Sequence, residues 1–165
     1  MAVALPAASA AAGDIAGQAS VIDGDTLDIH GTRVRLWGID APESDQLCRG
    51  DDSLPYRCGA TAANKLDAFI DRRPVHCRQR DIDRYGRIVA TCVIGDTDIG
   101  EWLVGRGLAL DWPRYSGGHY AAAQRGAESG ALGIWAGSFV EPWRYRTCRA
   151  ANGRPAACSD DPARP

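Results

Sequence analysis

The chain has 165 residues, of which 45% are hydrophobic and 24% are charged. That length and that apolar fraction are typical of one folded domain with a single core, and they exclude a disordered chain. The formal net charge of -2 lacks the basic surplus of strong non-specific nucleic-acid binders, so any affinity for a polyanion must be local. No apolar run approaches the roughly 20 residues of a membrane span, and we expect a soluble monomer.

The first 20 residues, MAVALPAASAAAGDIAGQAS, are rich in small residues and contain no basic residue. The runs Ala-Ser-Ala and Ala-Ala-Ala are typical of a signal-peptidase site, although the charged start of a secretory signal is missing. One interpretation is an export signal that is cleaved near Ala12 and whose basic start lies upstream; the other is a flexible leader. We assign residues 1–17 to this signal-like or flexible leader.

Two strands are predicted at the start of the domain. Residues Gln18–Ile29 place a polar Asp-Gly-Asp-Thr sequence between two apolar stretches, and Thr32–Trp37 alternate basic and apolar side chains. The pattern predicts consecutive antiparallel strands. The alternation sends Val34 and Leu36 to the core and projects Arg35 from the other face of a rigid strand.

A polar surface loop, Ser44–Tyr56, and a helix over Arg57–Arg73 are predicted next. The apolar positions of the helical segment recur at spacings of three and four, and an Arg-Arg-Pro sequence ends it. The loop directly follows Glu43, which makes it a candidate wall of a site.

A β-hairpin is predicted after this helix. Val75–Gln79 and Ile88–Ile94 have the composition of strands, and the turn residues 84–86 join them. A hairpin centred on that turn places Cys77 directly opposite Cys92.

Two further helical patterns follow, over Ile99–Arg106 and over Tyr120–Leu132. Strands and helices are mixed without β-α-β alternation, which favours a small antiparallel barrel dressed with helices, in the α+β class, over a doubly wound sheet. No repeat or second domain is visible. We expect the domain to span residues 18–146 and residues 147–165 to form a C-terminal tail.

The six cysteines include no C-x-x-C pair, and the three histidines do not cluster near them, which argues against a zinc site. Six cysteines allow 15 pairings. Local spacing favours Cys48-Cys58, Cys77-Cys92 and Cys148-Cys158, of which the second also has the hairpin geometry in its favour. Disulfides predict a secreted or periplasmic protein; the alternative is six buried free thiols in the cytosol.

Acidic and guanidinium groups recur in three segments, and together they are the groups that a metal-assisted phosphodiesterase needs. Asp25 and Asp40 offer oxygen ligands for a hard divalent cation, and Glu43 can position or deprotonate water. Arg35 and Arg87 can neutralise the charge that develops on a phosphate. Taken singly, each has an ordinary structural interpretation as a turn, a cap or a solvated strand face; their joint occurrence favours the chemical one.

Four blocks carry a resemblance to a known family. The chain resembles the staphylococcal nuclease (thermonuclease) family over about residues 21–135, in the right order. The blocks are IDGDT at 22–26, RLWGIDAPE at 35–43, DRYGR at 83–87 and LVGRGLA at 103–109. The resemblance implies a five-stranded OB-fold-type antiparallel β-barrel with three helices. It also implies calcium-dependent hydrolysis of DNA or RNA that leaves 3′-phosphates.

By the same resemblance, Asp25, Asp40 and the backbone carbonyl of Ala41 would bind Ca2+. The family usually has threonine at that last position, and a carbonyl ligand survives the change. Glu43 would activate water. The arginines already named, Arg35 and Arg87, would grip the phosphate.

Substrate contacts are implied for Arg84, Tyr85 and Tyr115, although Tyr85 also fits a packed hairpin residue. The pair Trp112-Pro113 stands where the family has residues that include another tyrosine, so base contacts are expected to differ. Trp37 is expected in the core and not as a base-stacking platform.

Two other functions stay open. The first is a non-catalytic module of the same fold that binds nucleic acid or protein; the retention of all five site side chains favours catalysis over it. The second is a small protein whose calcium is structural, which leaves the arginines unexplained. The slightly acidic charge predicts weak, salt-sensitive capture of long polymers and a preference for short oligonucleotides.

Overall fold

The computed structural model describes residues 13–160, so the predicted cleavage site near Ala12 lies outside the described residues. The strands are β1 (Asp14–Gly17), β2 (Ala19–Asp23), β3 (Thr26–Ile29), β4 (Thr32–Leu36), β5 (Ile39–Asp40), β6 (Cys48–Arg49), β7 (Pro55–Tyr56), β8 (Val75–Ile82), β9 (Ile88–Ile94), β10 (Thr97–Asp98) and β11 (Leu110–Asp111). The helices are α1 (Cys58–Ile70), α2 (Ile99–Gly105), α3 (Pro113–Ser116), α4 (Ala121–Ser129), the 3-10 helix η1 (Gly133–Ala136), α5 (Pro142–Ala150) and α6 (Pro155–Ser159). Part of the segment that we expected to be leader, β1, is paired with β8.

Seven strands form one sheet in the order β1-β8-β9-β4-β3-β2, with β10 paired to β9. Neighbouring strands are antiparallel except β4 and β9, which run parallel. The chain leaves β4 and passes through α1 and β8 before β9 returns beside it, and a long crossover of this kind permits parallel pairing. The expectation of an all-antiparallel sheet is therefore wrong at this pair.

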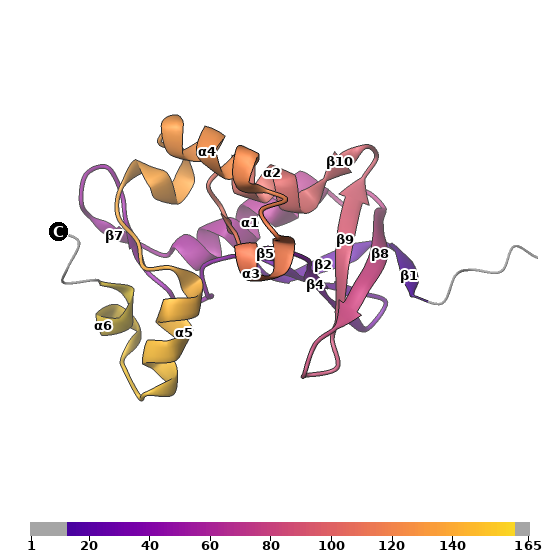
Figure 1. The fold of residues 1–165 in the computed structure, drawn as a ribbon, viewed down its shortest axis with the longest axis horizontal. Coiled ribbons are helices and arrows are strands. Elements are labelled where there is room, and N and C mark those ends of the chain that lie inside the picture. Colours follow the sequence, from indigo (N-terminus) through magenta and orange to yellow (C-terminus); the bar gives the residue numbers. More distant parts are fainter. Residues whose placement is uncertain (1–12, 161–165) are drawn as a thin grey trace, which may run out of the picture.

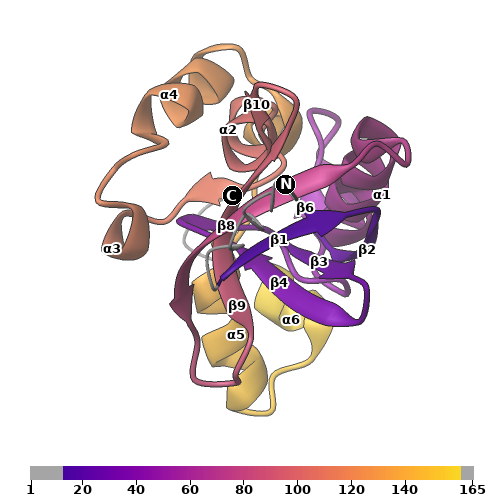
Figure 2. The ribbon, with the colours of Figure 1, turned by 90° about the vertical axis from the view of Figure 1, so that its right-hand side faces the viewer.

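The sheet is strongly curved but does not close into the predicted five-stranded barrel (Figure 2). Among residues 13–160, no ladder joins β1 to β2, which stand at the two ends of the strand order. A single residue, Gln18, separates these strands, so they follow each other end to end and cannot pair side by side. The mixed α+β class is confirmed, and an open curved sheet replaces the barrel.

The main core lies between the concave face of the sheet and one face of α1. Leu27, Val34 and Leu66 have no exposed surface, and Val34 and Leu36 point inward as predicted from their alternation with Arg35. Burial of a large aliphatic side chain stabilises the fold by about 1.5–3 kcal/mol, so this cluster is the main source of stability.

The predicted hairpin is present, and its two cysteines face each other. Cys77 pairs with Cys92 in the β8–β9 register, and both belong to the core. The disulfide between them has an S–S distance of 2.05 Å. β8 runs on to Ile82, beyond the predicted end at Gln79, after a register shift between Gln79 and Asp81.

Three predicted helices are present as α1, α2 and α4, each ending earlier than expected. Asp71 and Arg72 end α1 because both adopt left-handed backbone angles, with φ of 44° and 57°. The described residues contain six α-helices and not three, because α3, α5 and α6 form in segments predicted to be loop, domain end or tail. None of the six is long and apolar enough to cross a membrane.

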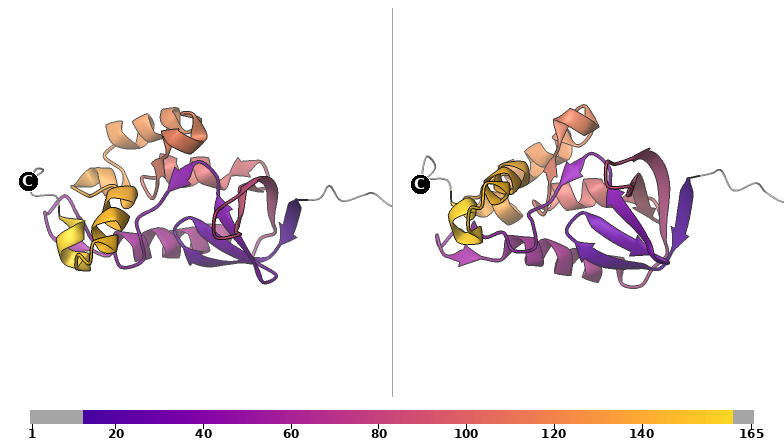
Figure 3. Two further views of the ribbon diagram at one scale, coloured as in Figure 1. Left: turned by 60° about the horizontal axis from the view of Figure 1, so that its bottom comes forward. Right: turned by 90° about the horizontal axis from the view of Figure 1, so that it is seen from below.

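The two C-terminal helices pack at the end of the molecule opposite the sheet, and α1 runs lengthwise between the two ends (Figures 1 and 3). Tyr145 on α5 is only 1% exposed, and its hydroxyl donates to Asp45 Oδ1 at 2.8 Å. On α6, Ser159 Oγ accepts from the Leu47 N–H at 2.9 Å. The predicted tail is thus folded against the loop that follows Glu43.

Two disulfides hold this end of the molecule. Cys148 and Cys158 join α5 to α6, and Cys48 and Cys58 join the loop to the start of α1. With the hairpin disulfide, all three predicted pairings are formed, and all six cysteines, which lie among the described residues, are paired.

Candidate functional site

Two buried aspartates form the centre of the site. Asp25 lies in the turn between β2 and β3 and is 4% exposed, whereas Asp40 ends β5 and has no exposed surface. The Ala41 N–H donates to Asp25 Oδ2 at 3.0 Å and links the two segments. Gly24 permits this approach, because a Cβ there would lie 2.7 Å from the Ala41 Cβ.

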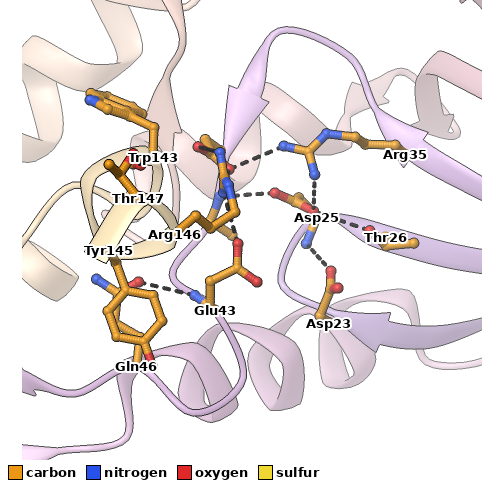
Figure 4. A network of polar contacts seen from close by, with 12 residues as sticks. Asp23, Asp25, Thr26, Arg35, Glu43, Gln46, Trp143, Tyr145, Arg146 and Thr147 are labelled. Atoms are coloured by element: carbon orange, nitrogen blue, oxygen red, sulfur yellow. Dashed lines mark hydrogen bonds and ion pairs between the residues drawn. The ribbon is translucent and has the colours of Figure 1, made fainter. Parts of the chain in front are cut away.

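Arg35 bridges the two aspartates from β4. Its Nη1 donates to Asp25 Oδ1 at 3.2 Å and its Nη2 to Asp40 Oδ1 at 3.1 Å (Figure 4). The side chain is 16% exposed, so these ion pairs are shielded from water and from salt. The strand fixes the guanidinium in a place where it neutralises both carboxylates.

A second guanidinium, which sequence reasoning missed, reaches the same carboxylates from α5. Arg146 donates through Nη1 to Asp40 Oδ1 at 2.9 Å and through Nη2 to Asp40 Oδ2 at 2.7 Å. Its Nη1 also donates to Glu43 Oε1 at 2.7 Å. Figure 4 shows Arg146 and Arg35 approaching the acidic groups from opposite sides.

The buried side chain of Gln46 holds the backbone of Glu43 in place. Its N–H donates to Gln46 Oε1 at 3.1 Å, and Gln46 Nε2 donates to the Val140 carbonyl oxygen at 2.6 Å. Gln46 has no exposed surface. A fully buried amide with both ends bonded thus joins the Glu43 loop to the segment that enters α5.

The charges of the site shift one another's pKa values. Burial raises the pKa of Asp40 to about 6, with Arg146 acting in the opposite direction. Burial and then the Asp25 charge raise the pKa of Asp23 to about 6. Burial lowers the pKa of Arg35 and of Arg146, but the carboxylates around them outweigh it, so that both pKa values lie above the ordinary one. The two arginines therefore stay charged.

Aromatic side chains pack beside the two arginines of the site. The Arg35 and Arg146 guanidinium carbons lie 5.7 Å and 5.4 Å from the Trp112 ring centroid. Trp143 stacks on Trp112 at 6.0 Å, and Tyr115 meets its edge at 4.5 Å. Tyr115, predicted to bind substrate, is thus joined to the site through Trp112, which stands where the family's tyrosine was expected.

Arg87 lies at the turn of the β8–β9 hairpin, directly before β9 begins. Its Nε donates to Asp83 Oδ2 at 2.7 Å. Val89 is opposite Arg35 in the parallel register. Arg87 directly precedes β9, and continuing the alternation of β9 back to it places Arg87 on the side of the sheet that Arg35 faces. Tyr85 is 69% exposed at the turn.

Two of the residues predicted to contact substrate, Arg84 and Tyr85, lie next to Arg87 in this turn. The guanidinium carbons of Arg84 and Arg87 lie 4.9 Å and 5.6 Å from the Tyr85 ring centroid. Arg84 and Tyr85 are exposed and Arg87 is partly buried, and together these cationic and aromatic groups can contact phosphate and base.

The predicted calcium ligands do not fit a cation in this arrangement. Each carboxylate oxygen of Asp25 and Asp40 already accepts a hydrogen bond from Thr26, Ala41, Arg35 or Arg146. Calcium needs six to eight oxygen ligands at about 2.3–2.6 Å, and neighbouring guanidinium charges repel it. Among residues 13–160, no group of three or more His, Cys, Asp or Glu side chains is arranged to hold a metal ion.

Comparison with models of known protein families shows to which family the chain belongs. The sequence model of the family described as staphylococcal nuclease homologue matches residues 33–137, which is more than half of the chain. The chain belongs to the staphylococcal nuclease family. The matched segment contains Arg35, Glu43 and Arg87, whereas Asp25 and Arg146 lie outside it.

Relatives of this nuclease-family chain carry several names. It is 48% identical over 127 residues to the succinoglycan biosynthesis protein ExoI of Rhizobium meliloti, covering 76% of this chain and 66% of that protein. It is 31% identical over 144 residues to the micrococcal nuclease of Shigella flexneri, covering 76% of each. To the probable staphylococcal-like nuclease CAN1 of Oryza sativa it is 32% identical over 116 residues, covering 69% of this chain and 32% of that protein. The chain thus spans just under two thirds of the Rhizobium protein and about a third of the rice protein.

Of the predicted site residues, the structure brings together Asp25, Arg35, Asp40, Ala41 and Glu43, with Arg87 on the same face of the sheet. Sequence reasoning missed Arg146 and Gln46 altogether. The one available signal for Arg146 was its position beside Tyr145 and two residues before Cys148, in an arginine-rich segment. A tyrosine and a cysteine nearby predict that the segment packs against the domain, but they do not predict the direction of its arginine side chains.

Proposed function

We propose that this protein is a nuclease that hydrolyses phosphodiester bonds of DNA or RNA and leaves 3′-phosphate ends. The observation that carries the proposal is the fixed group of Arg35, Glu43 and two buried aspartates. The alternation of β9, continued back to Arg87, adds this arginine on the side that Arg35 faces. Family membership supports it, as do the nuclease names of several relatives.

The residues divide the reaction as follows. Glu43 takes a proton from a water molecule whose oxygen forms the new bond to phosphorus. The bond from phosphorus to the 5′ oxygen breaks, that oxygen takes a proton from solvent, Glu43 returns its proton to solvent, and the phosphate stays on the 3′ oxygen. Arg87 and Arg35 stabilise the phosphate charge; each terminal nitrogen of Arg35 keeps a second hydrogen beyond its aspartate bond.

Calcium dependence belongs to the proposal as a requirement to be tested. The ligands would be Asp25, Asp40 and the Ala41 carbonyl, yet the aspartate oxygens are engaged by arginines. When bound there, calcium would supply positive charge to the phosphate, and the steps above state only what the protein's own residues do. An exported location is also part of the proposal, and the three disulfides support it.

The first test is hydrolysis of a single-stranded oligonucleotide by the oxidised protein, with calcium and with chelator, followed by identification of the product ends. We expect 3′-phosphate ends, and we expect Glu43→Gln to lower kcat by about 100-fold. Glu128→Gln, on the exposed part of α4, is the control and should retain wild-type activity. Equal activity of wild type and Glu43→Gln would contradict the assigned role.

A specific observation favours the second candidate, a binding module without catalysis. Arg146 engages both Asp40 and Glu43, which are two of the groups that the reaction needs. Wild-type protein that binds the oligonucleotide but does not cleave it under any cation condition would favour this module over the nuclease.

We propose a path for the nucleic-acid strand along the outer face of the sheet. A groove of about 460 Å³ lies on this face beside Trp37, Arg78, Arg80 and His119. Trp37 follows Arg35 by two residues and is only partly buried, and the Arg80 guanidinium carbon stands 4.5 Å from its ring centroid. A strand that leaves the active site along this face meets cationic groups suited to its phosphates.

The path predicts a length-dependent effect of Arg80→Ala. We expect KM to rise about fivefold for oligonucleotides long enough to reach the groove, because one phosphate contact is lost, and to stay unchanged for a dinucleotide. Arg106→Ala is matched, because Arg106 stands 5.5 Å from the Trp102 ring and does not line the groove. Equal effects of the two variants on the long substrate would reject the path.

A further inference from the structure

The guanidinium of Arg146 lies between Asp40, one of the predicted calcium ligands, and Glu43, the proposed base. It bonds both oxygens of Asp40 and one oxygen of Glu43, at 2.7–2.9 Å. Asp40 is fully buried, so its negative charge needs a partner inside the protein. Arg146 shares that role with Arg35 in the metal-free protein, and of the two only Arg146 bonds Asp40 Oδ2.

We propose that Arg146 is an internal cation that competes with a divalent metal for Asp40, and that metal binds only when this side chain swings away. The inference rests on the proposed nuclease function only for the identity of the metal, calcium. Charge makes the two occupants of Asp40 Oδ2 exclusive, because the Arg146 guanidinium, whose Nη2 is 2.7 Å from that oxygen, and a divalent cation bound to it repel each other.

The backbone of α5 is anchored, so only the side chain of Arg146 can move away from Asp40. Tyr145, directly before Arg146, is buried and bonded to Asp45. Cys148, two residues after Arg146, is joined to Cys158 by a disulfide. The helix backbone is therefore fixed. The Arg146 side chain is 35% exposed, so its long stem can rotate towards solvent without unfolding the helix.

A released Arg146 has two places to go. The face of Trp112, whose ring centroid is already 5.4 Å from the guanidinium carbon, can accept it as a cation–π partner. A substrate phosphate can accept it as a bidentate partner. Arg35 differs, because its bridge between Asp25 and Asp40 comes from the centre of a strand and is only 16% exposed. It is thus expected to stay in place when metal binds, and the oxygen that the movement of Arg146 sets free is Asp40 Oδ2, to which Arg35 does not bond.

The test is calcium binding by isothermal titration to the full chain with its disulfides intact, without substrate. We expect Arg146→Gln to bind calcium at least about tenfold more tightly than wild type, which corresponds to roughly 1.4 kcal/mol. The matched control is Arg149→Gln, on the same helix, whose ion pair at 3.4 Å goes to the exposed Asp45. We expect its calcium affinity to equal that of wild type.

Thermal unfolding supplies a second readout. Without calcium, Arg146→Gln should unfold at a lower temperature than wild type, because Asp40 loses a partner, and calcium should raise its Tm more than that of wild type. Arg146→Lys keeps a charge but loses the bidentate contact, so its calcium affinity should fall between the two. It replaces Arg146→Gln if that variant does not fold.

Calcium affinity of Arg146→Gln equal to or below that of wild type, with the fold retained, would overturn the inference. So would wild-type and Arg146→Lys proteins with the same affinity. Neither outcome depends on hydrolysis. If wild type cleaves no nucleic acid and Arg146→Gln still gains calcium affinity, the nuclease proposal fails and this inference stands.

Discussion

Arg35→Ala is expected to lower the free energy of unfolding by about 3 kcal/mol and kcat by at least 100-fold. The loss of stability follows from burial, because Asp25 and Asp40 are 6% and 0% exposed in their side chains and would lose the guanidinium that bridges them. Arg146 still neutralises Asp40, which keeps the expected loss near the lower end for a broken buried pair. Urea denaturation and single-turnover kinetics measure the two effects separately.

Arg33→Ala is the matched control for this variant. Arg33 lies two residues before Arg35 on the same face of the same strand, but its side chain is 53% exposed and pairs with Asp28 at 3.3 Å. An exposed pair of this kind contributes about 0–1 kcal/mol. If the two variants lose equal stability, the bridge between the aspartates is not what makes Arg35 important.

Arg87→Ala separates catalysis from stability. Its partner Asp83 is 18% exposed at a hairpin turn and retains two backbone N–H donors, so the variant should lose less than about 1 kcal/mol of stability. The fall in kcat should nevertheless approach that of Arg35→Ala, because the guanidinium faces the same side of the sheet. A wild-type kcat for Arg87→Ala would remove this residue from the proposed site.

Local patterns explain what could be predicted from the sequence. The pairing of Cys77 with Cys92 followed from two strand patterns and a turn that lie close together in the chain, and it is present. α1 was predicted in the same local way, because its apolar residues recur regularly at spacings of three and four. The parallel contact between β4 and β9 could not be predicted in this way, because it joins segments separated by a helix and another strand.

Arg146 shows the limit of such reasoning for the site. It bonds Asp40 across 106 positions of the sequence. Its helix, α5, is mostly polar and buries little besides Tyr145 and the first residue, Pro142. The segment therefore has no regular spacing of apolar residues from which a helix could be predicted. Charged residues on a polar segment are ordinarily solvated, and only the packing of Tyr145 and the nearby disulfide direct this arginine inward.

Gly59→Ala is expected to damage both the fold and the reaction although residue 59 carries no functional group. Gly59 lies in the first turn of α1 directly beneath the site loop, and a Cβ there would stand 1.8 Å from the Glu43 carbonyl oxygen and 2.9 Å from that of Pro42. Both are backbone atoms, so the loop itself must shift. We expect a loss of roughly 3 kcal/mol in stability, the upper end for overpacking, since the helix-propensity gain of alanine does not offset the overlap.

The same shift should lower activity. Glu43 must stay within hydrogen-bonding reach of the attacking water, and a displacement of about 1 Å can lower the rate about 100-fold. KM should change less, because the phosphate contacts proposed for Arg87 and the groove lie on the sheet, away from this loop. Steady-state kinetics at a temperature well below the midpoint of unfolding would isolate this effect from loss of folded protein.

Gly126→Ala is the matched substitution with the opposite expected sign. Gly126 is also inside a helix, α4, but nothing lies within 4 Å of a Cβ at that position. Without overlap, the higher helix propensity of alanine should stabilise the protein by about 0.5–1 kcal/mol and leave kcat unchanged. If Gly59→Ala instead behaves like Gly126→Ala, α1 does not hold the Glu43 loop in place, and the position of Glu43 must depend on Gln46 and on Arg146 alone.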